Sequence, residues 1–200
     1  MSGTTPAAPI RLAALGDSLT AGYGLPAAAA FPVRLEAALR RKGYDVTIAN
    51  AGISGDTTAG GLARLDAVIA GRPDGVLLEL GTNDALGGLA PERVRANLDA
   101  MLTRLTAAGI PVLLCGARDL GRHGRDYTAA FEGMYPELAK RYHTLLDPFF
   151  LEGVSGRPDL TQADGLHPTA AGVETIVTRI LPVTETFLSR LGAQPAPTAP

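Results

Sequence analysis

Four short segments of this chain carry the residue types needed to hydrolyse an acyl ester. They are Gly16-Asp17-Ser18-Leu19, Gly52-Ile53-Ser54-Gly55-Asp56, Gly81-Thr82-Asn83-Asp84 and Asp164-Gly165-Leu166-His167-Pro168. A serine hydroxyl attacks a carbonyl readily only when a base takes its proton, and the oxyanion that forms needs hydrogen-bond donors. The segments offer a serine, a carboxylate–histidine pair and three donors. In this order they predict a serine hydrolase site.

Ser18 is the candidate nucleophile. It comes directly after an apolar run, and glycines at positions 16, 22 and 24 would allow a tight turn around it. Gly-Asp-Ser is also typical of the start of a helix, where a serine side chain caps the first turn. Taken alone, the segment leaves both interpretations open, and the other three segments favour the nucleophile.

His167 is the candidate general base and Asp164 is its candidate partner. The imidazole would accept the Ser18 proton and pass it to the leaving group. Asp164 lies three residues earlier and could bond the other ring nitrogen, fix the tautomer and stabilise the imidazolium. The other two histidines, His123 and His143, lie in a Gly- and Arg-rich loop and at the start of an expected strand. We expect surface or structural roles for them.

Three donors are expected to face the oxyanion: the backbone N–H groups of Ser18 and Gly55, and the side-chain amide of Asn83. A glycine lets the backbone approach a substrate closely, and an asparagine at a strand end can point an N–H at the same atom. Four neighbouring polar residues are expected to form loop hydrogen bonds and helix caps instead: Asp17, Asn50, Asp56 and Asp84.

Two further reactive side chains stand inside apolar runs and are expected to be structural. Glu79 lies in the run 76–80, where a buried charge must be paired, and Arg64 and Arg118 are the candidate partners of an ion pair. Cys115, the only cysteine, lies in the run 112–115. We expect a buried, inert thiol there, and a single cysteine can form no internal disulfide.

The elements that must position these groups alternate between strand and helix. Apolar runs predict strands at 10–15, 46–49, 76–80, 111–115 and 144–147, and apolar spacing predicts helices at 31–41, 57–70, 91–108, 128–141 and 169–191. Pro182 is expected to kink or break the last helix. Strands without alternation are buried on both faces, so we expect a three-layer α/β/α sandwich around a parallel five-stranded sheet. Its carboxyl edge, where such sheets bind ligands, would gather the four segments.

Length and composition limit the possible classes of protein. The 200 residues, 46% hydrophobic and 19% charged, suit one globular domain, expected at 10–191 between tails at 1–9 and 192–200. A net charge of −2 gives no reason to expect nucleic acid or an anionic membrane as a partner. No apolar stretch is long enough for an integral membrane segment. The chain begins without a basic, apolar leader, so we expect either a cytoplasmic protein or a periplasmic or secreted one whose leader was removed.

Two other classes of function compete with the hydrolase. A flavodoxin-like ligand-binding module without catalysis should show a phosphate-cradling loop, and the chain has neither Gly-x-Gly-x-x-Gly after the first strand nor a P-loop. A metal-dependent hydrolase could use Asp164 and His167 as ligands. The chain lacks His-Glu-x-x-His and has too few histidines for a usual zinc site. We therefore expect no cofactor and no metal.

The four segments resemble the four sequence blocks of the SGNH (GDSL-type) hydrolases. The longer strings at 16–23, 53–57, 61–65 and 79–81 are similar to the thioesterase I, lysophospholipase L1 and arylesterase branch of that family. The resemblance extends over about residues 10 to 190. It implies a flavodoxin-like fold, no metal and an acyl-enzyme mechanism. It also implies the same roles for the candidate residues: Ser18, Asp164 and His167 as triad, and Ser18, Gly55 and Asn83 as oxyanion hole.

The expected substrate is a small-molecule ester or thioester. We expect hydrolysis of short- to medium-chain aryl or alkyl carboxylic esters. An acyl-CoA thioesterase or a lysophospholipase with the same triad stays open, since members of this branch act on esters, thioesters and lysophospholipids. The loop 116–127 is more charged than the wall of a long acyl site needs to be. The oligomeric state stays open as well.

Overall fold

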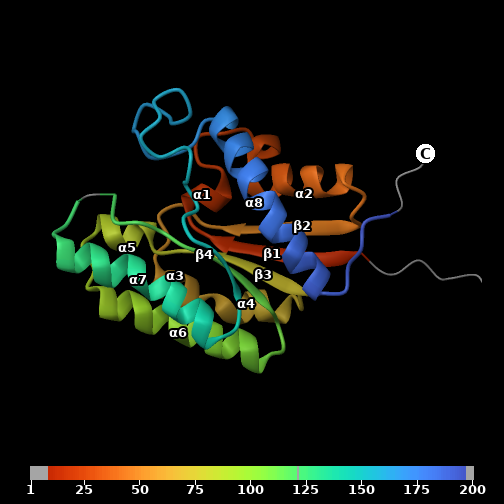
Figure 1. Ribbon diagram of the computed structural model, residues 1–200, viewed down its shortest axis with the longest axis horizontal. Coiled ribbons are helices and arrows are strands. Elements are labelled where there is room, and N and C mark those ends of the chain that lie inside the picture. The colour runs from red at the N-terminus through yellow and green to blue at the C-terminus, as the bar shows by residue number, and fades with distance from the viewer. Residues whose placement is uncertain (1–8, 121, 197–200) are drawn as a thin grey trace, which may run out of the picture.

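A five-stranded parallel sheet forms the centre of the computed structural model, which describes residues 9–120 and 122–196 (Figure 1). Its strands are β1 (Ile10–Gly16), β2 (Val46–Gly52), β3 (Gly75–Glu79), β4 (Val112–Cys115) and β5 (Leu145–Asp147). All four pairings are parallel and the order across the sheet is β2-β1-β3-β4-β5. This is the flavodoxin-like doubly wound order. The expected fold class is confirmed.

Helices cover both faces of the sheet. They are α1 (Ser18–Ala21), the 3-10 turn η1 (Ala27–Ala29), α2 (Phe31–Arg41), α3 (Thr58–Ala63), α4 (Leu65–Ala70), α5 (Thr82–Leu86), α6 (Pro91–Ala107), α7 (Arg125–Arg141) and α8 (Ala170–Arg190). In Figure 1, α2 and α8 lie on one side of the sheet, and α3 to α7 lie on the other. The result is the three-layer arrangement expected for uninterrupted apolar strands.

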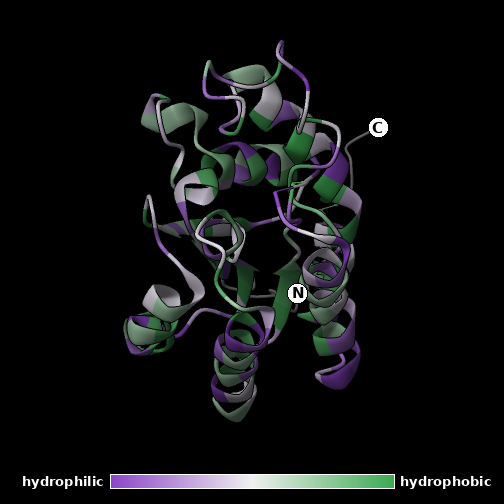
Figure 2. Cartoon of the chain, turned by 90° about the vertical axis from the view of Figure 1, so that its left-hand side faces the viewer, coloured by the Kyte–Doolittle hydropathy of each residue, from purple (hydrophilic) through white to green (hydrophobic). Residues whose placement is uncertain are grey.

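The core consists of two apolar layers, one on each face of the sheet. Every residue of β3 is buried, and its side chains alternate between the layers. Leu77 packs in the layer under α2 and α8, whereas Val76 and Leu78 pack in the layer under α6 and α7. Figure 2 shows the hydrophobic strands enclosed by helices whose hydrophilic residues lie toward the outside. Burial on both faces therefore explains the continuous apolar runs.

Three local features differ from the sequence-based expectation. The helix expected at 57–70 is broken at Arg64, which ends α3 and precedes α4. The helix α8 runs through Pro182 without a break, because Pro182 lies on an exposed face while buried residues on either side hold the helix to the sheet. A short helix, α5, follows β3 where no helix was expected.

The order of the strands also decides where a site can form. The chain winds outward in one direction from β1 to β2 and in the other from β3 to β5. The loops after β1 and β3 therefore separate and leave a crevice at the carboxyl edge, which is where open α/β sheets bind ligands. Ser18 follows β1 and Asn83 follows β3, so both stand at this switch point.

The expected tails lie mostly outside the described residues. Of residues 192–196, none belongs to a helix or strand, and the Ala196 N–H donates to the Gly43 carbonyl at 2.9 Å. Within residues 9–120 and 122–196, the structure contains no helix with the length and apolar character required to cross a membrane.

Candidate active site

Ser18 begins α1 directly after β1, with its side chain inside the fold. Asp17 caps this helix, since its Oδ1 accepts from the Leu19 N–H at 2.9 Å. The helix is thus capped by Asp17 and not by Ser18, so the Ser18 hydroxyl is available for a hydrogen bond to another residue. Gly16 is required by space, because a Cβ at that position would lie 2.0 Å from the Thr20 hydroxyl oxygen. Sequence and packing together set Ser18 at the sheet edge.

The three residues expected to form a triad are hydrogen-bonded in series. His167 Nε2 lies 2.9 Å from Ser18 Oγ, although 149 positions separate the two residues. His167 Nδ1 lies 2.6 Å from Asp164 Oδ2. The other oxygen of Asp164 accepts from the N–H groups of Leu166 at 2.9 Å and His167 at 3.0 Å. One carboxylate therefore folds the loop and orients the ring at the same time.

The protonation state of Asp164 sets the tautomer of the ring. The hydrogen bond from the Leu166 N–H, followed by that from the His167 ring, lowers the pKa of Asp164 to about 2. The carboxylate is ionised at neutral pH and can only accept a hydrogen bond. In the neutral imidazole, Nδ1 then carries the proton and Nε2 presents a lone pair to the Ser18 hydroxyl. This is the arrangement that general-base catalysis requires.

A second His–Asp pair shows what distinguishes the first. His123 Nδ1 lies 2.5 Å from Asp119 Oδ1, and the ring packs against Tyr127 with centroids 4.2 Å apart. Among the contacts of the described residues, no serine hydroxyl bonds to this ring, whereas His167 reaches Ser18. Both histidine rings therefore bond to a carboxylate, but only the His167 ring also contacts a serine hydroxyl, that of Ser18.

Two residues near the triad were not expected from the sequence. The Tyr23 ring packs against the His167 ring with centroids 4.5 Å apart and planes inclined by 39°. Gln162 donates from Nε2 to the carbonyls of Tyr23 at 2.8 Å and Pro168 at 3.0 Å. The side chain of Gln162 thus joins the loop after α1 to the loop before α8. The sequence did carry one indication of a role for Tyr23, because this residue ends the string 16–23 that resembles the esterase branch of the family.

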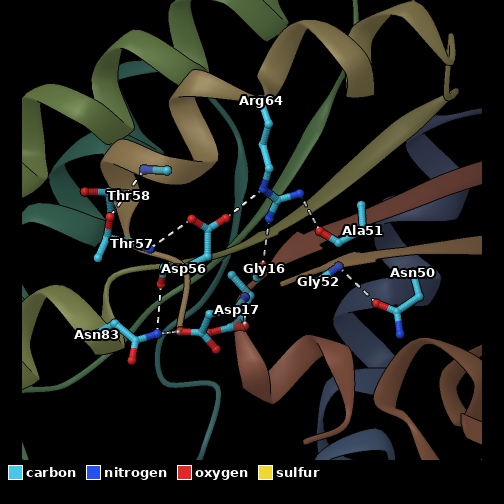
Figure 3. Close-up of polar contacts among 12 residues, drawn as sticks. Gly16, Asp17, Asn50, Ala51, Gly52, Asp56, Thr57, Thr58, Arg64 and Asn83 are labelled. Carbon is cyan, nitrogen blue, oxygen red and sulfur yellow. Dashed lines mark hydrogen bonds and ion pairs between the residues drawn. The ribbon is translucent and has the colours of Figure 1, made fainter. Parts of the chain in front are cut away.

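The candidate oxyanion donors Gly55 and Asn83 come from two other segments at the same edge, and Figure 3 shows the Asn83 amide directed at Asp56, the residue after Gly55. Gly55 has φ +82°, a left-handed conformation that favours glycine, and a Cβ there would meet no atom within 4 Å. The turn around it is closed by the Asp56 N–H donating to the Ile53 carbonyl at 3.0 Å. Asn83 donates from Nδ2 to the Asp56 carbonyl at 2.8 Å and to Asp17 Oδ2 at 3.2 Å.

The expected ion pair of Glu79 is wrong. The Thr20 hydroxyl donates to Glu79 Oε2 at 2.8 Å, while Arg64 bonds to Asp56 and Arg118 pairs with acids of other helices and loops. Glu79 Oε2 lies beside Gly16, where a Cβ would come within 2.7 Å of it, and the Arg64 guanidinium bonds to the Gly16 carbonyl and to Asp56 instead. Burial, more than any other cause, raises the pKa of Glu79 well above its usual range. Burial therefore favours the neutral form of this carboxyl, and no ion pair compensates its charge.

Asp17 shares this buried environment. Burial is the largest cause that raises its pKa, to about 7, and the nearby acids Asp56 and Asp84 add to the effect. Between about pH 4 and about pH 7 the folded chain therefore binds more protons at Asp17 and Glu79 than the unfolded chain does. The free energy of unfolding is expected to fall as the pH rises through this window.

Glu79→Gln is expected to weaken this pH dependence. Glutamine keeps an oxygen for the Thr20 hydroxyl and has no proton to lose. The melting temperature should therefore fall less between about pH 5 and about pH 8 than in the wild type, as calorimetry would show. Glu137→Gln, at an exposed pair with Arg95, serves as the control. A Glu79→Gln chain that follows the wild-type pH curve would mean that Glu79 is ionised in the fold.

A parallel α/β sandwich with a hydroxyl, an imidazole and a carboxylate in series at its carboxyl edge has the architecture of a serine hydrolase. Residues 14–174 match the GDSL-like Lipase/Acylhydrolase family, and the chain belongs to that family. It is a carboxylic ester hydrolase. No group of three or more His, Cys, Asp or Glu within the described residues is arranged to hold a metal ion.

Relatives with known names extend over most of the chain. The Esterase TesA of Pseudomonas aeruginosa is 41% identical over 186 residues, which are 92% of each chain. The Thioesterase 1/protease 1/lysophospholipase L1 of Escherichia coli K12 is 43% identical over 155 residues, 77% of this chain and 73% of that protein. The crystal structure of TesA has a TM-score of 0.83 and 41% identity, with 90% of this chain and 99% of that chain covered.

Proposed function

We propose that this esterase uses Ser18 as nucleophile, His167 as general base and acid, and Asp164 as the orienting carboxylate. The observation that carries the proposal is the hydrogen-bonded series from Asp164 through His167 to Ser18. Ser18 Oγ attacks the carbonyl carbon of the ester while its proton moves to His167 Nε2. The ionised Asp164 stabilises the imidazolium that results.

The tetrahedral intermediate then collapses to an acyl-enzyme. His167 Nε2 gives its proton to the leaving oxygen, the bond from carbon to that oxygen breaks, and the acyl group stays on Ser18. A water molecule enters, His167 takes a proton from it, and the hydroxide attacks the acyl carbon. Collapse of the second intermediate releases the carboxylic acid and returns the proton to Ser18 Oγ.

Three donors support the oxyanion in this proposal. Ser18 is the first residue of α1, where a backbone N–H has no intrahelical acceptor. The Asp56 N–H closes the turn on Ile53, so the Gly55 N–H is outside that hydrogen bond. Asn83 holds the Asp56 carbonyl at 2.8 Å and the Asp17 carboxylate at 3.2 Å. We infer that it exchanges the longer of these bonds for the oxyanion.

Asn83→Ala is expected to lower kcat by about a hundredfold or more, because one donor to the oxyanion is lost. KM should change less, since the donor acts on the intermediate more than on the bound ester. Steady-state kinetics with p-nitrophenyl acetate measures both quantities. The control is Asn50→Ala, which removes a side-chain amide near the end of β2 that bonds to Ala21 and Gly52. Equal losses in the two variants would argue for a general loop effect.

We propose short- to medium-chain carboxylic esters as the preferred substrates. The segment from the end of β4 into the first turn of α7 supports this, because it carries Arg118, Asp119, Arg122 and Asp126 where a long acyl site needs apolar side chains. Thioesters and lysophospholipids are the alternatives, since one relative is named for both activities. A panel of p-nitrophenyl esters from two to sixteen carbons, with acyl-CoA and lysophospholipid included, decides between them. A kcat/KM that peaks at sixteen carbons would contradict the proposal.

A further inference from the structure

Arg64 lies at the break between α3 and α4 and holds three separate segments of the chain (Figure 3). Its Nε donates to Asp56 Oδ2 at 2.7 Å, Nη1 to the Ala51 carbonyl at 2.7 Å, and Nη2 to the Gly16 carbonyl at 2.9 Å. The side chains of Arg64 and Asp56 are only 21% and 10% exposed. A single guanidinium thus joins the end of β1, the end of β2 and the turn that contains Gly55.

Each candidate oxyanion donor is connected to this guanidinium by a short path. The Gly16 carbonyl lies two residues before Ser18, and it accepts from the Ile53 N–H at 3.1 Å as well as from Arg64. Asp56 follows Gly55 directly, so its bond to Arg64 fixes one end of the glycine turn. The Asp56 carbonyl accepts from Asn83 and orients that amide.

We propose that Arg64 is a positioning residue that sets the geometry of the oxyanion hole. It does so by fixing the distances between the loops that carry Ser18, Gly55 and Asn83. This inference rests on the proposed function, and it assigns to Arg64 a role in turnover without contact with the substrate. Donors must lie near 3 Å from the position of the oxyanion, so a small shift of one loop weakens the hole.

The local structure is built to receive this side chain. The planar guanidinium has donors that point in several fixed directions, whereas a lysine ammonium is a single point charge on a flexible stem. Asp56 also accepts from the Thr57 N–H at 3.1 Å through Oδ1. A Cβ on Gly60 would lie 1.8 Å from that oxygen, so a side chain at position 60 would displace the carboxylate. The helix break at Arg64 directs the chain so that these bonds can form together.

Arg64→Met tests the proposal, with Arg64→Lys as the variant that keeps the charge. In Arg64→Met we expect kcat with p-nitrophenyl acetate to fall about a hundredfold, as for loss of one oxyanion donor, with a smaller change in KM. The affinity for a trifluoromethyl ketone, which forms a tetrahedral oxyanion on a serine, should fall by a similar factor. The pH dependence of kcat/KM should keep its wild-type midpoint, because the Ser18–His167–Asp164 contacts are unchanged. Arg64→Lys should recover only part of the loss.

Chemical rescue separates positioning from stability. We expect added guanidinium at non-denaturing concentration to restore part of the kcat of Arg64→Ala, and added ammonium to restore none. Assays run well below the melting temperature, with folded protein measured by circular dichroism. Arg95→Met removes an exposed arginine paired with Glu137 and should keep wild-type kinetics.

Two results would overturn the inference. The first is a folded Arg64→Met enzyme with wild-type kcat and wild-type affinity for the ketone, which would leave Arg64 a purely structural residue. The second is a loss that appears in KM alone. Neither result would bear on the proposed nucleophile, because covalent labelling of Ser18 by an organophosphate tests that assignment separately.

Discussion

Replacing Ser18 by alanine is expected to abolish ester hydrolysis and to leave the fold intact. The hydroxyl group is all that the substitution removes, and this group bonds to His167 Nε2 in the free enzyme. The helix cap survives, because Asp17 rather than Ser18 provides it. Loss of a nucleophilic serine lowers kcat by about a millionfold in a well-studied serine protease, so we expect a loss of at least about ten-thousandfold here. Kinetics with p-nitrophenyl acetate and the melting temperature measure the two effects.

Ser54→Ala is the matched control for this prediction. Ser54 is exposed and lies beside Gly55 in another loop of the same edge. An organophosphate should form a covalent adduct on Ser18 in the wild type and in Ser54→Ala, and none in Ser18→Ala, as peptide mass mapping would show. A Ser18→Ala enzyme that keeps more than a few per cent of the wild-type kcat would contradict the assignment of the nucleophile.

The contact between Ser18 and His167 was predictable because topology does not depend on the length of the intervening chain. The 149 positions between them are filled by strand–helix units, and parallel strands place all their carboxyl ends at one edge. Uninterrupted apolar runs were enough to predict those strands. Asp164 was predictable for a different reason, since a separation of three residues lets a carboxylate reach both the backbone and the ring of His167.

The partners of the charged side chains were not predictable in the same way. Glu79 lies near the sheet edge, and the sequence left Arg64 and Arg118 as its candidate partners. The choice depends on which carboxylate the Arg64 guanidinium can reach around the turn after β2, and that is Asp56. Glu79 instead fills a space beside Gly16 that exists only once β1 and β3 pair. Hydrophobic pattern decides the register of strands, but it carries no information about such polar contacts.

The packing of Tyr23 on His167 shows the same limit. The tyrosine belongs to the loop after α1 and the histidine to the loop before α8. Their rings pack directly on each other, and Gln162 holds the two loops together by hydrogen bonds to both. No spacing rule connects these three positions. Their contact follows from the path of loops whose backbones are irregular, and such paths are set by many weak contacts rather than by periodicity.

Asp164→Asn is expected to lower kcat/KM by about a thousandfold to ten-thousandfold. Asn Oδ1 can still accept from the N–H groups of Leu166 and His167, so the loop should keep its shape. The other atom becomes an NH₂ group, which donates to Nδ1 instead of accepting from it. Nε2 then carries the ring proton and cannot accept one from Ser18. The expected fall in kcat/KM thus comes from a change of the His167 tautomer, in which the proton moves from Nδ1 to Nε2.

The pH dependence separates this explanation from a change in the charge of Asp164. The pKa of Asp164 lies at about 2, chiefly because the Leu166 N–H and the His167 ring bond to the carboxylate. The Asp164 carboxylate therefore stays ionised between about pH 5 and about pH 8, and its own titration cannot produce a rise of wild-type kcat/KM over that range.

The control for Asp164→Asn is Asp159→Asn, a nearby exposed carboxylate that bonds to Arg157 and lies outside the series to Ser18. It should keep wild-type kcat/KM, because removing its charge alters no contact of the ring. If Asp164→Asn also keeps wild-type kcat/KM, the ring does not need a carboxylate to hold its tautomer. The catalytic unit would then be the Ser18–His167 pair, and Asp164 would serve only to fold the loop through its backbone hydrogen bonds.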